Sequence, residues 1–347
     1  MYQDRFHLEI IPFSMTPDPG LLYMTPMHRE ALSGLVYAIL EHKGFVVLTG
    51  EAGTGKTTLL SRLLRYVPEE RASFSLVLNP TLSPAEFLES ALWDFGITDI
   101  PESKVHRLQK LQQLVTASHI KGKTCVLIVD EAHKLSPEVL EEIRLLTNFE
   151  TADHKLLQIV LVGQDELRAT LNRNDLRQLK QRIAVRFELK PLAADEVYAY
   201  MRYRWAASGG QEFPFEREAV QSVARASGGV PRVINAICDN ALLLIYANEA
   251  PWITSEHIRL VLTDLDLSEP TMPVAPSAAL RAGLAPGLEA RPTHPASVAP
   301  GVAPIRLEIP KPAAVPEVLP PVRLTTLERY LPPEPKPTLW MKWAVRF

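Results

Sequence analysis

Short, continuous apolar runs alternate with segments of helical spacing through the first half of the chain. The runs predict strands buried on both faces, as in a parallel sheet, over residues 45–48, 73–79, 125–129, 156–164 and 186–190. Between the strands, apolar residues recur every three or four positions and predict helices over residues 57–66, 83–96, 105–118 and 135–149. The alternation predicts an α/β fold in which helices cover both faces of a parallel sheet.

From Pro191 onward the pattern becomes helical only. Four segments carry apolar residues at three- and four-residue spacing, over residues 192–209, 217–229, 230–249 and 255–267. Gly228, Gly229 and Pro251 separate them. Such a bundle suits a small helical domain that acts as a lid over a neighbouring site.

The two ends of the chain differ from this pattern. Near the start, Pro12, Pro17, Pro19 and Pro26 predict an extended arm and then a helix from Met27. Tyr23 and His28 are candidates for contacts to a base and ribose, although both residues could simply pack the arm onto the core.

Residues 268–347 hold 17 of the 30 prolines and little periodicity, which predicts a disordered tail. Its last ten residues, TLWMKWAVRF, could form a docking peptide or an interfacial anchor, or simply an unstructured end. The predicted domains are an arm that packs on the nucleotide site (1–44), an α/β domain (45–190), a helical lid (191–266) and the Pro/Ala-rich tail (267–347).

The segment at residues 45–58 joins the first strand to a helix through the pattern G-x-x-x-x-G-K-[ST]. Glycines let backbone N–H groups point at phosphate oxygens, and the following helix directs its positive end at the same anion. The residues expected to contact a nucleoside triphosphate are Gly50, Glu51, Ala52, Gly53, Thr54, Gly55, Lys56, Thr57 and Thr58. Lys56 supplies a mobile charge for the outer phosphates, and Thr57 supplies a hydroxyl for Mg²⁺. An ordinary glycine-rich turn is the alternative.

Two carboxylates, Asp130 and Glu131, end the third apolar run. Buried acids are costly, so this pair is expected at a strand tip that faces a cation or water. Asp130 would hold Mg²⁺ directly or through water, and Glu131 would polarise the attacking water as a general base. A strand that ends in capped acidic residues is the alternative.

Three further polar residues are candidates for the same site. Gln164 follows the fourth strand and could orient the water or sense the γ-phosphate, unless it is only a turn residue. Arg232 begins a helix and could reach back to the γ-phosphate, or lie free on the surface. Arg182 belongs to a basic stretch over residues 168–186, which fits a solvated face, a nucleic-acid contact or a finger arginine for a neighbouring subunit's nucleotide. Arg182 is the candidate finger.

Charge and cysteine content add little to this picture. A formal net charge of -3 over 347 residues gives no global argument for a nucleic acid or an anionic membrane as partner. Cys125 and Cys238 fall in apolar runs and predict small buried hydrophobes rather than a disulfide or a metal pair. The first residues lack the apolar segment of a signal peptide, and no run approaches the roughly 18 apolar residues of a membrane span. A soluble cytoplasmic protein is expected.

The motifs GEAGTGKT, VLIVDEAH, VLVGQ, LKQRIAVRFEL and GGVPR follow one another in an order that resembles the AAA+ superfamily of P-loop ATPases. The N-terminal arm resembles that of the general secretion pathway protein A family. This resemblance implies Walker A roles for Lys56 and Thr57, Walker B roles for Asp130 and Glu131, and sensor roles for Gln164 and Arg232. It also implies Arg182 as the finger, and assembly into a ring or filament with nucleotide at subunit boundaries.

One departure from the family concerns the region after the ATPase. The secretion protein carries a membrane helix and a peptidoglycan-binding domain there, whereas a Pro-rich tail stands in this sequence. The ATPase block also resembles DNA-transposition regulators that form filaments on DNA.

The expected function is that of an ATPase that uses ATP and Mg²⁺ to drive conformational change in a homo-oligomeric, secretion- or envelope-related assembly, which could lie at the inner membrane. An ATP-switched, DNA-binding regulator of transposition type is the alternative. In a third alternative, the tail tethers the ATPase to a membrane or a secretion machine.

Overall fold

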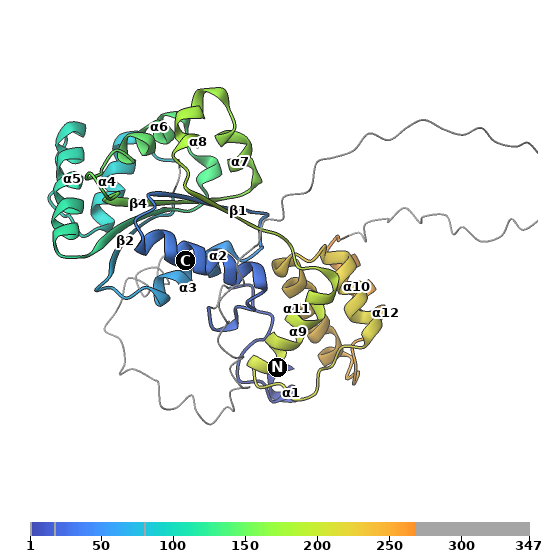
Figure 1. Cartoon of the computed structure of the whole chain (residues 1–347). Coiled ribbons are helices and arrows are strands. Elements are labelled where there is room, and N and C mark those ends of the chain that lie inside the picture. Colours follow the sequence, from blue (N-terminus) through green and yellow to red (C-terminus); the bar gives the residue numbers. More distant parts are fainter. Residues whose placement is uncertain (1, 17–18, 80, 268–347) are drawn as a thin grey trace, which may run out of the picture. The chain divides into compact units, whose positions relative to one another are not determined.

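A computed structural model describes residues 2–16, 19–79 and 81–267. Most of the predicted Pro/Ala-rich tail, over residues 268–347, lies outside the described residues, and the expectation of disorder there stays a prediction. The described residues belong to one compact unit. Within it, a sheet region precedes a helical region (Figure 1).

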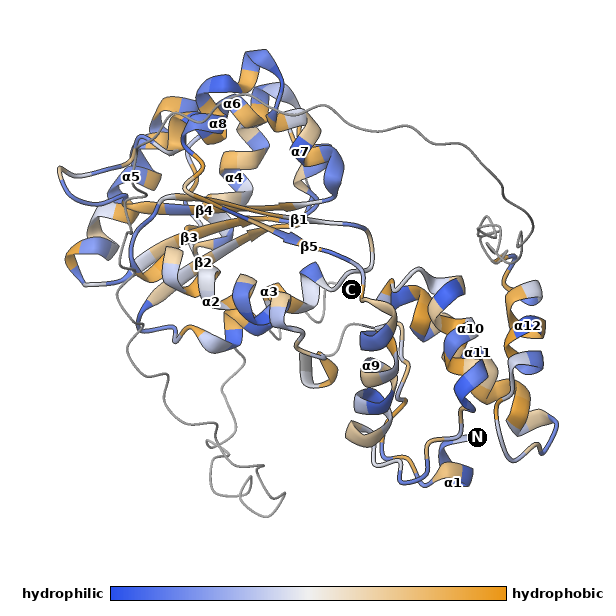
Figure 2. Ribbon diagram, turned by 45° about the vertical axis from the view of Figure 1, so that its right-hand side comes forward, coloured by the Kyte–Doolittle hydropathy of each residue, from blue (hydrophilic) through white to orange (hydrophobic). Residues whose placement is uncertain are grey.

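Five parallel strands form the sheet, in the order β2-β3-β4-β1-β5. Their bounds are β1 Phe45–Gly50, β2 Ala72–Val77, β3 Thr124–Val129, β4 Leu157–Gly163 and β5 Val185–Leu189. Every residue of β1, β3 and β4 is buried, which agrees with the continuous apolar runs of the sequence. Figure 2 shows these strands coloured as hydrophobic between layers of helices. The predicted parallel α/β fold is confirmed.

Helices cover both faces of the sheet. On one face lie α2 (Pro26–Leu40) and α3 (Lys56–Tyr66), and on the other lie α4 (Pro84–Asp94), α5 (Lys104–Ile120), α6 (Pro137–Leu146), α7 (Asp165–Leu171) and α8 (Arg177–Gln181) (Figures 1 and 2). Three short 3₁₀ helices accompany them: η1 Pro19–Leu21, η2 Ala132–Lys134 and η3 Asn174–Leu176. This arrangement is the three-layer α/β/α architecture that the pattern predicts.

Helix starts follow the capping signals of the sequence. Ser83 caps α4 by accepting from the Glu86 N–H, and the Glu86 carboxylate accepts in return from the Ser83 N–H. Ser136 caps α6 by accepting from the Val139 N–H, with proline at the first helical position. The basic stretch before β5 differs from expectation, because α7, η3 and α8 divide it into three short pieces.

The helical region comprises α9 (Ala194–Ala207), α10 (Arg217–Ser227), α11 (Pro231–Ala247) and α12 (Ser255–Asp264). Its core is a separate cluster that includes Trp205, Ile237 and Leu242. The sheet has its own core, built around β3, β4 and the inner faces of α4–α6. Cys125 and Cys238 are both buried and free, one in each core.

The N-terminal arm packs into the helical core over its first part. A short helix, α1 (Tyr2–Phe6), stands where the sequence predicted extended chain, and the Tyr2 hydroxyl donates to Asp239 at 2.5 Å. Phe13 is fully buried in the same cluster. Tyr23 packs edge-on against Tyr200 of α9. Of the two roles considered for Tyr23, this contact agrees with packing of the arm onto the core.

Candidate phosphate-binding site

The phosphate loop connects β1 to α3 in a conformation that glycine makes possible. Gly53 and Gly55 have φ angles of 83° and 94°, in the left-handed region that residues with a Cβ rarely adopt. Gly55 is the N-cap of α3 and offers no side-chain acceptor to the helix. The first N–H groups of α3 therefore point into the loop without an intrahelical partner, which is the arrangement that binds anions.

Lys56 extends its amine back into this loop. Its Nζ donates to the carbonyl oxygens of Gly50 at 2.8 Å and of Glu51 at 2.9 Å, and the residue is buried. Burial lowers the pKa of the amine, and the nearby carboxylates of Glu131 and Asp130 partly oppose that shift. The lysine thus holds its charge beside the loop with only carbonyl oxygens as partners.

Asp130 meets the start of α3 although the two lie far apart in sequence. Thr57 Oγ1 donates to Asp130 Oδ2 at 3.1 Å, and the Glu131 N–H donates to Asp130 Oδ1 at 2.8 Å. Burial raises the pKa of Asp130, while the hydrogen bonds from Glu131 and Thr57 lower it. In the sheet, β4 lies between β1, which leads to the loop before Thr57, and β3, which precedes Asp130. Because the strands are parallel, the carboxyl ends of β1 and β3 lie at the same edge of the sheet.

Glu131 has a left-handed backbone, with φ of 53°. Its Oε2 lies 3.2 Å from Lys134 Nζ and 3.7 Å from His133 Nε2. The Gln164 N–H donates to Nδ1 of the same histidine at 3.4 Å, which links the ends of β3 and β4. Glu131 and His133 therefore form a polar pair after β3, and the backbone of Gln164 joins it from the end of β4.

The two candidate arginines lie in different surroundings. Arg232 begins α11 beside the phosphate loop, because a Cβ added to Gly53 would lie 2.8 Å from Arg232 Cβ. Arg182 follows α8 and donates from Nη1 to Thr147 Oγ1 at 2.9 Å, at the end of α6. The described contacts thus bring Arg232, but not Arg182, to the phosphate loop of the same chain.

His28 holds the loop in a way that sequence reasoning missed. The residue is buried, its Nε2 lies 3.2 Å from the Thr54 carbonyl oxygen, and its Nδ1 lies 2.7 Å from Thr25 Oγ1. A carbonyl only accepts, so Nε2 carries the proton and Nδ1 accepts from the threonine hydroxyl. Both ring nitrogens are used within the protein rather than being free for a base. The signal in the sequence was Thr25-Pro26, a helix start that places His28 at the third helical position.

The residues present fit a nucleoside triphosphate with Mg²⁺. An open helix start and a buried amine held by carbonyl oxygens suit phosphate oxygens. The hydroxyl of Thr57 and the carboxylate of Asp130 are oxygen ligands of the kind that Mg²⁺ prefers. The described residues contain no group of three or more His, Cys, Asp or Glu placed to hold a metal. An ion here would therefore complete its ligands with phosphate and water, as Mg²⁺ usually does.

A parallel sheet with a phosphate loop after β1 and an acidic pair after β3 defines a P-loop protein. A family model described as AAA domain matches residues 39–171. Over 264 residues the chain is 43% identical to general secretion pathway protein A of Aeromonas hydrophila, which covers 75% of this chain and 48% of that protein. The family match and this identity confirm the resemblance to the AAA+ P-loop ATPases of the general secretion pathway protein A type that the motifs predicted.

The chain is also similar to a phage protein and to two solved structures. The chain is 24% identical over 256 residues to ATP-dependent target DNA activator B of Escherichia phage Mu, which covers 72% of this chain and 75% of that protein. Among solved structures, the ORC2 protein of Aeropyrum pernix has a TM-score of 0.57 at 17% identity and covers 73% of this chain and 71% of its own. Cdc6p of Pyrobaculum aerophilum has a TM-score of 0.56 at 20% identity, with 73% and 70% covered. These two structures agree with the fold.

The chain spans about half the length of the secretion protein that it matches. Within the described ranges, no helix combines the length and the apolar character needed to cross a bilayer.

Proposed function

We propose that the chain binds ATP with Mg²⁺ and hydrolyses it to drive conformational change in a multisubunit assembly. The observation that supports this most is the hydrogen bond at 3.1 Å between the Thr57 hydroxyl and the Asp130 carboxylate, beside the buried amine of Lys56. These groups come from two separate parts of the sequence, residues 56–57 and residue 130, and meet at one edge of the sheet. A glycine-rich turn without chemistry would require no such meeting.

Each residue has a distinct role in this proposal. The open N–H groups of the loop and the Lys56 amine bind the phosphates, and Thr57 and Asp130 hold Mg²⁺, which supplies charge neutralisation when bound. Glu131 accepts a proton from the attacking water as that water becomes a nucleophile. To do so, its carboxylate must leave the contact with Lys134 and turn toward the phosphate loop. This ion pair is half exposed, so releasing it costs on the order of 1 kcal/mol or less.

Gln164 and Arg232 are proposed to sense the γ-phosphate. Gln164 stands at the end of β4, the strand between the two that carry the loop and the acids, and is joined to the Glu131 group through His133. Arg232 begins the first turn of α11 against Gly53, so a change at the phosphates reaches the helical region directly. This contact is the proposed route by which hydrolysis moves the helical region as a lid.

A titration of ATP binding and phosphate release against Mg²⁺ tests the proposal. Asp130→Asn keeps the size of the side chain and one acceptor oxygen but removes the charge that attracts the ion. We expect the Mg²⁺ concentration for half-maximal phosphate release to rise at least about tenfold, since one charge-assisted ligand is worth roughly 1.5–3 kcal/mol. Asp175→Asn is the matched control, because that carboxylate is exposed and pairs with Arg173. Equal Mg²⁺ dependence in all three proteins would contradict the proposed ion site.

Arg182 is proposed as the finger that one subunit presents to the nucleotide of its neighbour. Within its own chain, Arg182 is held by the hydrogen bond to Thr147 and does not reach the phosphate loop. A role at a phosphate group therefore requires the nucleotide of a neighbouring subunit. Arg182→Ala should lower turnover without weakening ATP binding. Mixing this variant with Lys56→Ala, which keeps its finger but has a defective loop, should restore turnover at mixed interfaces. If no mixture releases phosphate faster than the two variants do when measured separately and added, Arg182 does not act in trans.

The biological setting is proposed from the relatives. The identity with general secretion pathway protein A supports a cytoplasmic, secretion- or envelope-related role, with attachment to an assembly at the inner membrane. The client remains to be identified by crosslinking in cells, and co-purification with envelope proteins is the expected outcome.

A DNA-binding regulator is the second candidate, because the alignment with the phage activator covers three-quarters of that protein. In the basic stretch, however, Arg168 pairs with Glu188 and Arg173 with Asp175, which leaves fewer charges for phosphates. Retention of duplex DNA with ATP, falling steeply as salt rises, would favour the second candidate. No retention at low salt would dismiss it.

A further inference from the structure

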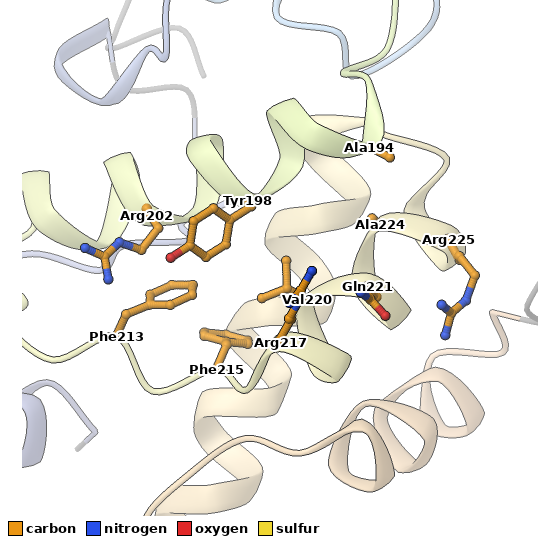
Figure 3. A pocket seen from close by; sticks show the side chains of 10 residues that line it. All are labelled: Ala194, Tyr198, Arg202, Phe213, Phe215, Arg217, Val220, Gln221, Ala224 and Arg225. Atoms are coloured by element: carbon orange, nitrogen blue, oxygen red, sulfur yellow. The ribbon is translucent and has the colours of Figure 1, made fainter.

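The helical region carries a groove of about 780 Å³, and none of the residues that line it belongs to the phosphate loop (Figure 3). Its sides are formed by α9 and α10, which present residues one helical turn apart. These are Ala194, Tyr198 and Arg202 on α9, and Arg217, Gln221 and Arg225 on α10. Positions i, i+4 and i+8 on each helix give the groove a length of about 12 Å, since a helix rises 1.5 Å per residue.

The floor of the groove is aromatic and fixed in place. Phe213 and Phe215, in the connection between the two helices, stack with ring centroids 5.1 Å apart. Tyr198 packs edge-on against Phe213 at 6.0 Å and is 50% exposed. Phe215 and Val220 are buried in the helical core, so their positions do not depend on a ligand. The groove therefore offers a preformed apolar surface.

Three exposed arginines, Arg202, Arg217 and Arg225, line the edge of the groove around this floor. Arg202 lies over the Phe213 ring at 5.6 Å, and Arg225 donates to Ser222 Oγ at 3.0 Å. No carboxylate of the described part of the chain lies within ion-pair distance of any of the three, and no acidic residue lines the groove.

Three other exposed arginines are paired within the chain. Arg168, Arg173 and Arg259 each pair with a carboxylate at 3.2 Å or less. The cationic edge of the groove is therefore a local feature with no internal counter-charge. A partner that fits must bring negative charge at the edge and apolar surface at the centre.

We propose that this groove binds an acidic peptide segment of a partner protein, with a bulky apolar side chain inserted between Tyr198 and Phe215. An extended segment of about four residues spans 12 Å, because each residue reaches at most about 3.3–3.6 Å. Aspartate or glutamate on either side of the apolar residue then meets the guanidinium groups, which bind carboxylates through two parallel N–H groups. The site recruits a partner to the helical region, apart from the nucleotide chemistry.

A nucleic acid fits the same surface less well. Phosphate contacts need cations spaced along a polar track, and bases need exposed rings on which to stack. Among the rings lining the groove, only Tyr198 is largely exposed, and the arginines surround an apolar centre rather than forming a track. The peptide is therefore the occupant that the groove favours.

A displayed library of short random peptides, selected on the full-length protein, tests the proposal. Enriched peptides should combine aspartate or glutamate with leucine, phenylalanine or tryptophan. A fluorescent copy of the best peptide should then lose at least about tenfold in affinity for the double variant Arg217→Glu, Arg225→Glu, which corresponds to about 1.4 kcal/mol. Replacing the acidic residues of the peptide by lysine should restore binding to that variant and abolish it for the wild type.

Matched variants separate charge from folding. Arg259→Ala removes an exposed arginine of the same helical region that is already paired, and it should bind the peptide like the wild type. Tyr198→Ala keeps all three arginines and should weaken binding through the lost apolar contact. Basal phosphate release should be unchanged in each, since none of these residues touches the phosphate loop.

Three results would overturn the proposal. They are enrichment of no acidic peptide, binding that is equal in the charge-reversed variant, and displacement of the peptide by single-stranded oligonucleotide with a higher affinity of its own. A change in oligomeric state caused by the same substitutions without peptide would also overturn it, because the groove would then be an interface between copies of this chain.

Discussion

His28 gives a direct test of how the phosphate loop is held. His28→Ala removes two buried hydrogen bonds between neutral groups, one to Thr54 and one to Thr25. Each is worth about 1 kcal/mol net. The cavity left by the buried ring adds about 1–2 kcal/mol. The free energy of unfolding should therefore fall by about 3 kcal/mol, a large fraction of the stability of an ordinary domain.

ATP binding should weaken in the same variant even where the protein remains folded. The Thr54 carbonyl then loses a partner, and the loop must be ordered by the ligand itself. We expect the affinity to fall about tenfold, which is about 1.4 kcal/mol. Urea unfolding with and without a non-hydrolysable ATP analogue measures both quantities.

His106→Ala is the control, because that histidine is exposed on α5. It should change neither quantity. A His28→Ala protein with wild-type stability and wild-type ATP affinity would refute the role of His28 as a clamp on the loop.

Two further predictions concern the frame around the site. Burial, and after it two neighbouring imidazoles, lowers the pKa of His42 from 6.5, so its neutral form is favoured in the fold. The neutral imidazole of His42 therefore contributes to the stability of the fold above pH 6.5, the pKa of an unfolded histidine. This stabilisation is lost as the pH falls through the lower pKa that His42 has in the folded protein. The melting temperature of His42→Asn should therefore fall less than that of the wild type between about pH 7 and about pH 5, and an equal fall would contradict this. Gly229→Ala would place a Cβ 2.0 Å from the Leu192 carbonyl oxygen and should cost at least about 2 kcal/mol in urea unfolding. Gly228→Ala, which meets no atom within 4 Å, should cost about 1 kcal/mol, and equal costs would count against the clash.

Much of the fold was predictable because its signals are local. The apolar runs at β1, β3 and β4 and the Ser-Pro helix starts at α4 and α6 identify elements from a few residues each. The phosphate loop and the acidic pair are equally local patterns. Their meeting at Thr57 and Asp130 follows once the strands are parallel, since every such strand ends at the same edge.

The rest depends on contacts between distant parts of the chain. The Thr25-Pro26 helix start places His28 at the third helical position, but it does not tell that the ring reaches Thr54, 26 residues away. The sequence offered Arg182 as a finger, but not the hydrogen bond to Thr147 that holds it. The groove in the helical region was missed because its arginines look like ordinary surface residues in the sequence. Only the structure shows that no carboxylate of the described residues pairs with them.

The central claim is that this edge of the sheet performs ATP hydrolysis with Glu131 as the base. Glu131→Gln keeps the size of the side chain and removes its ability to accept a proton from water. Parallel measurements of ATP binding by calorimetry and of steady-state phosphate release, with exposed Glu138→Gln as the control, test the claim most directly. The ATP affinity of Glu131→Gln should be nearly unchanged, and its turnover should fall at least about 100-fold. Turnover equal to that of the wild type would contradict it.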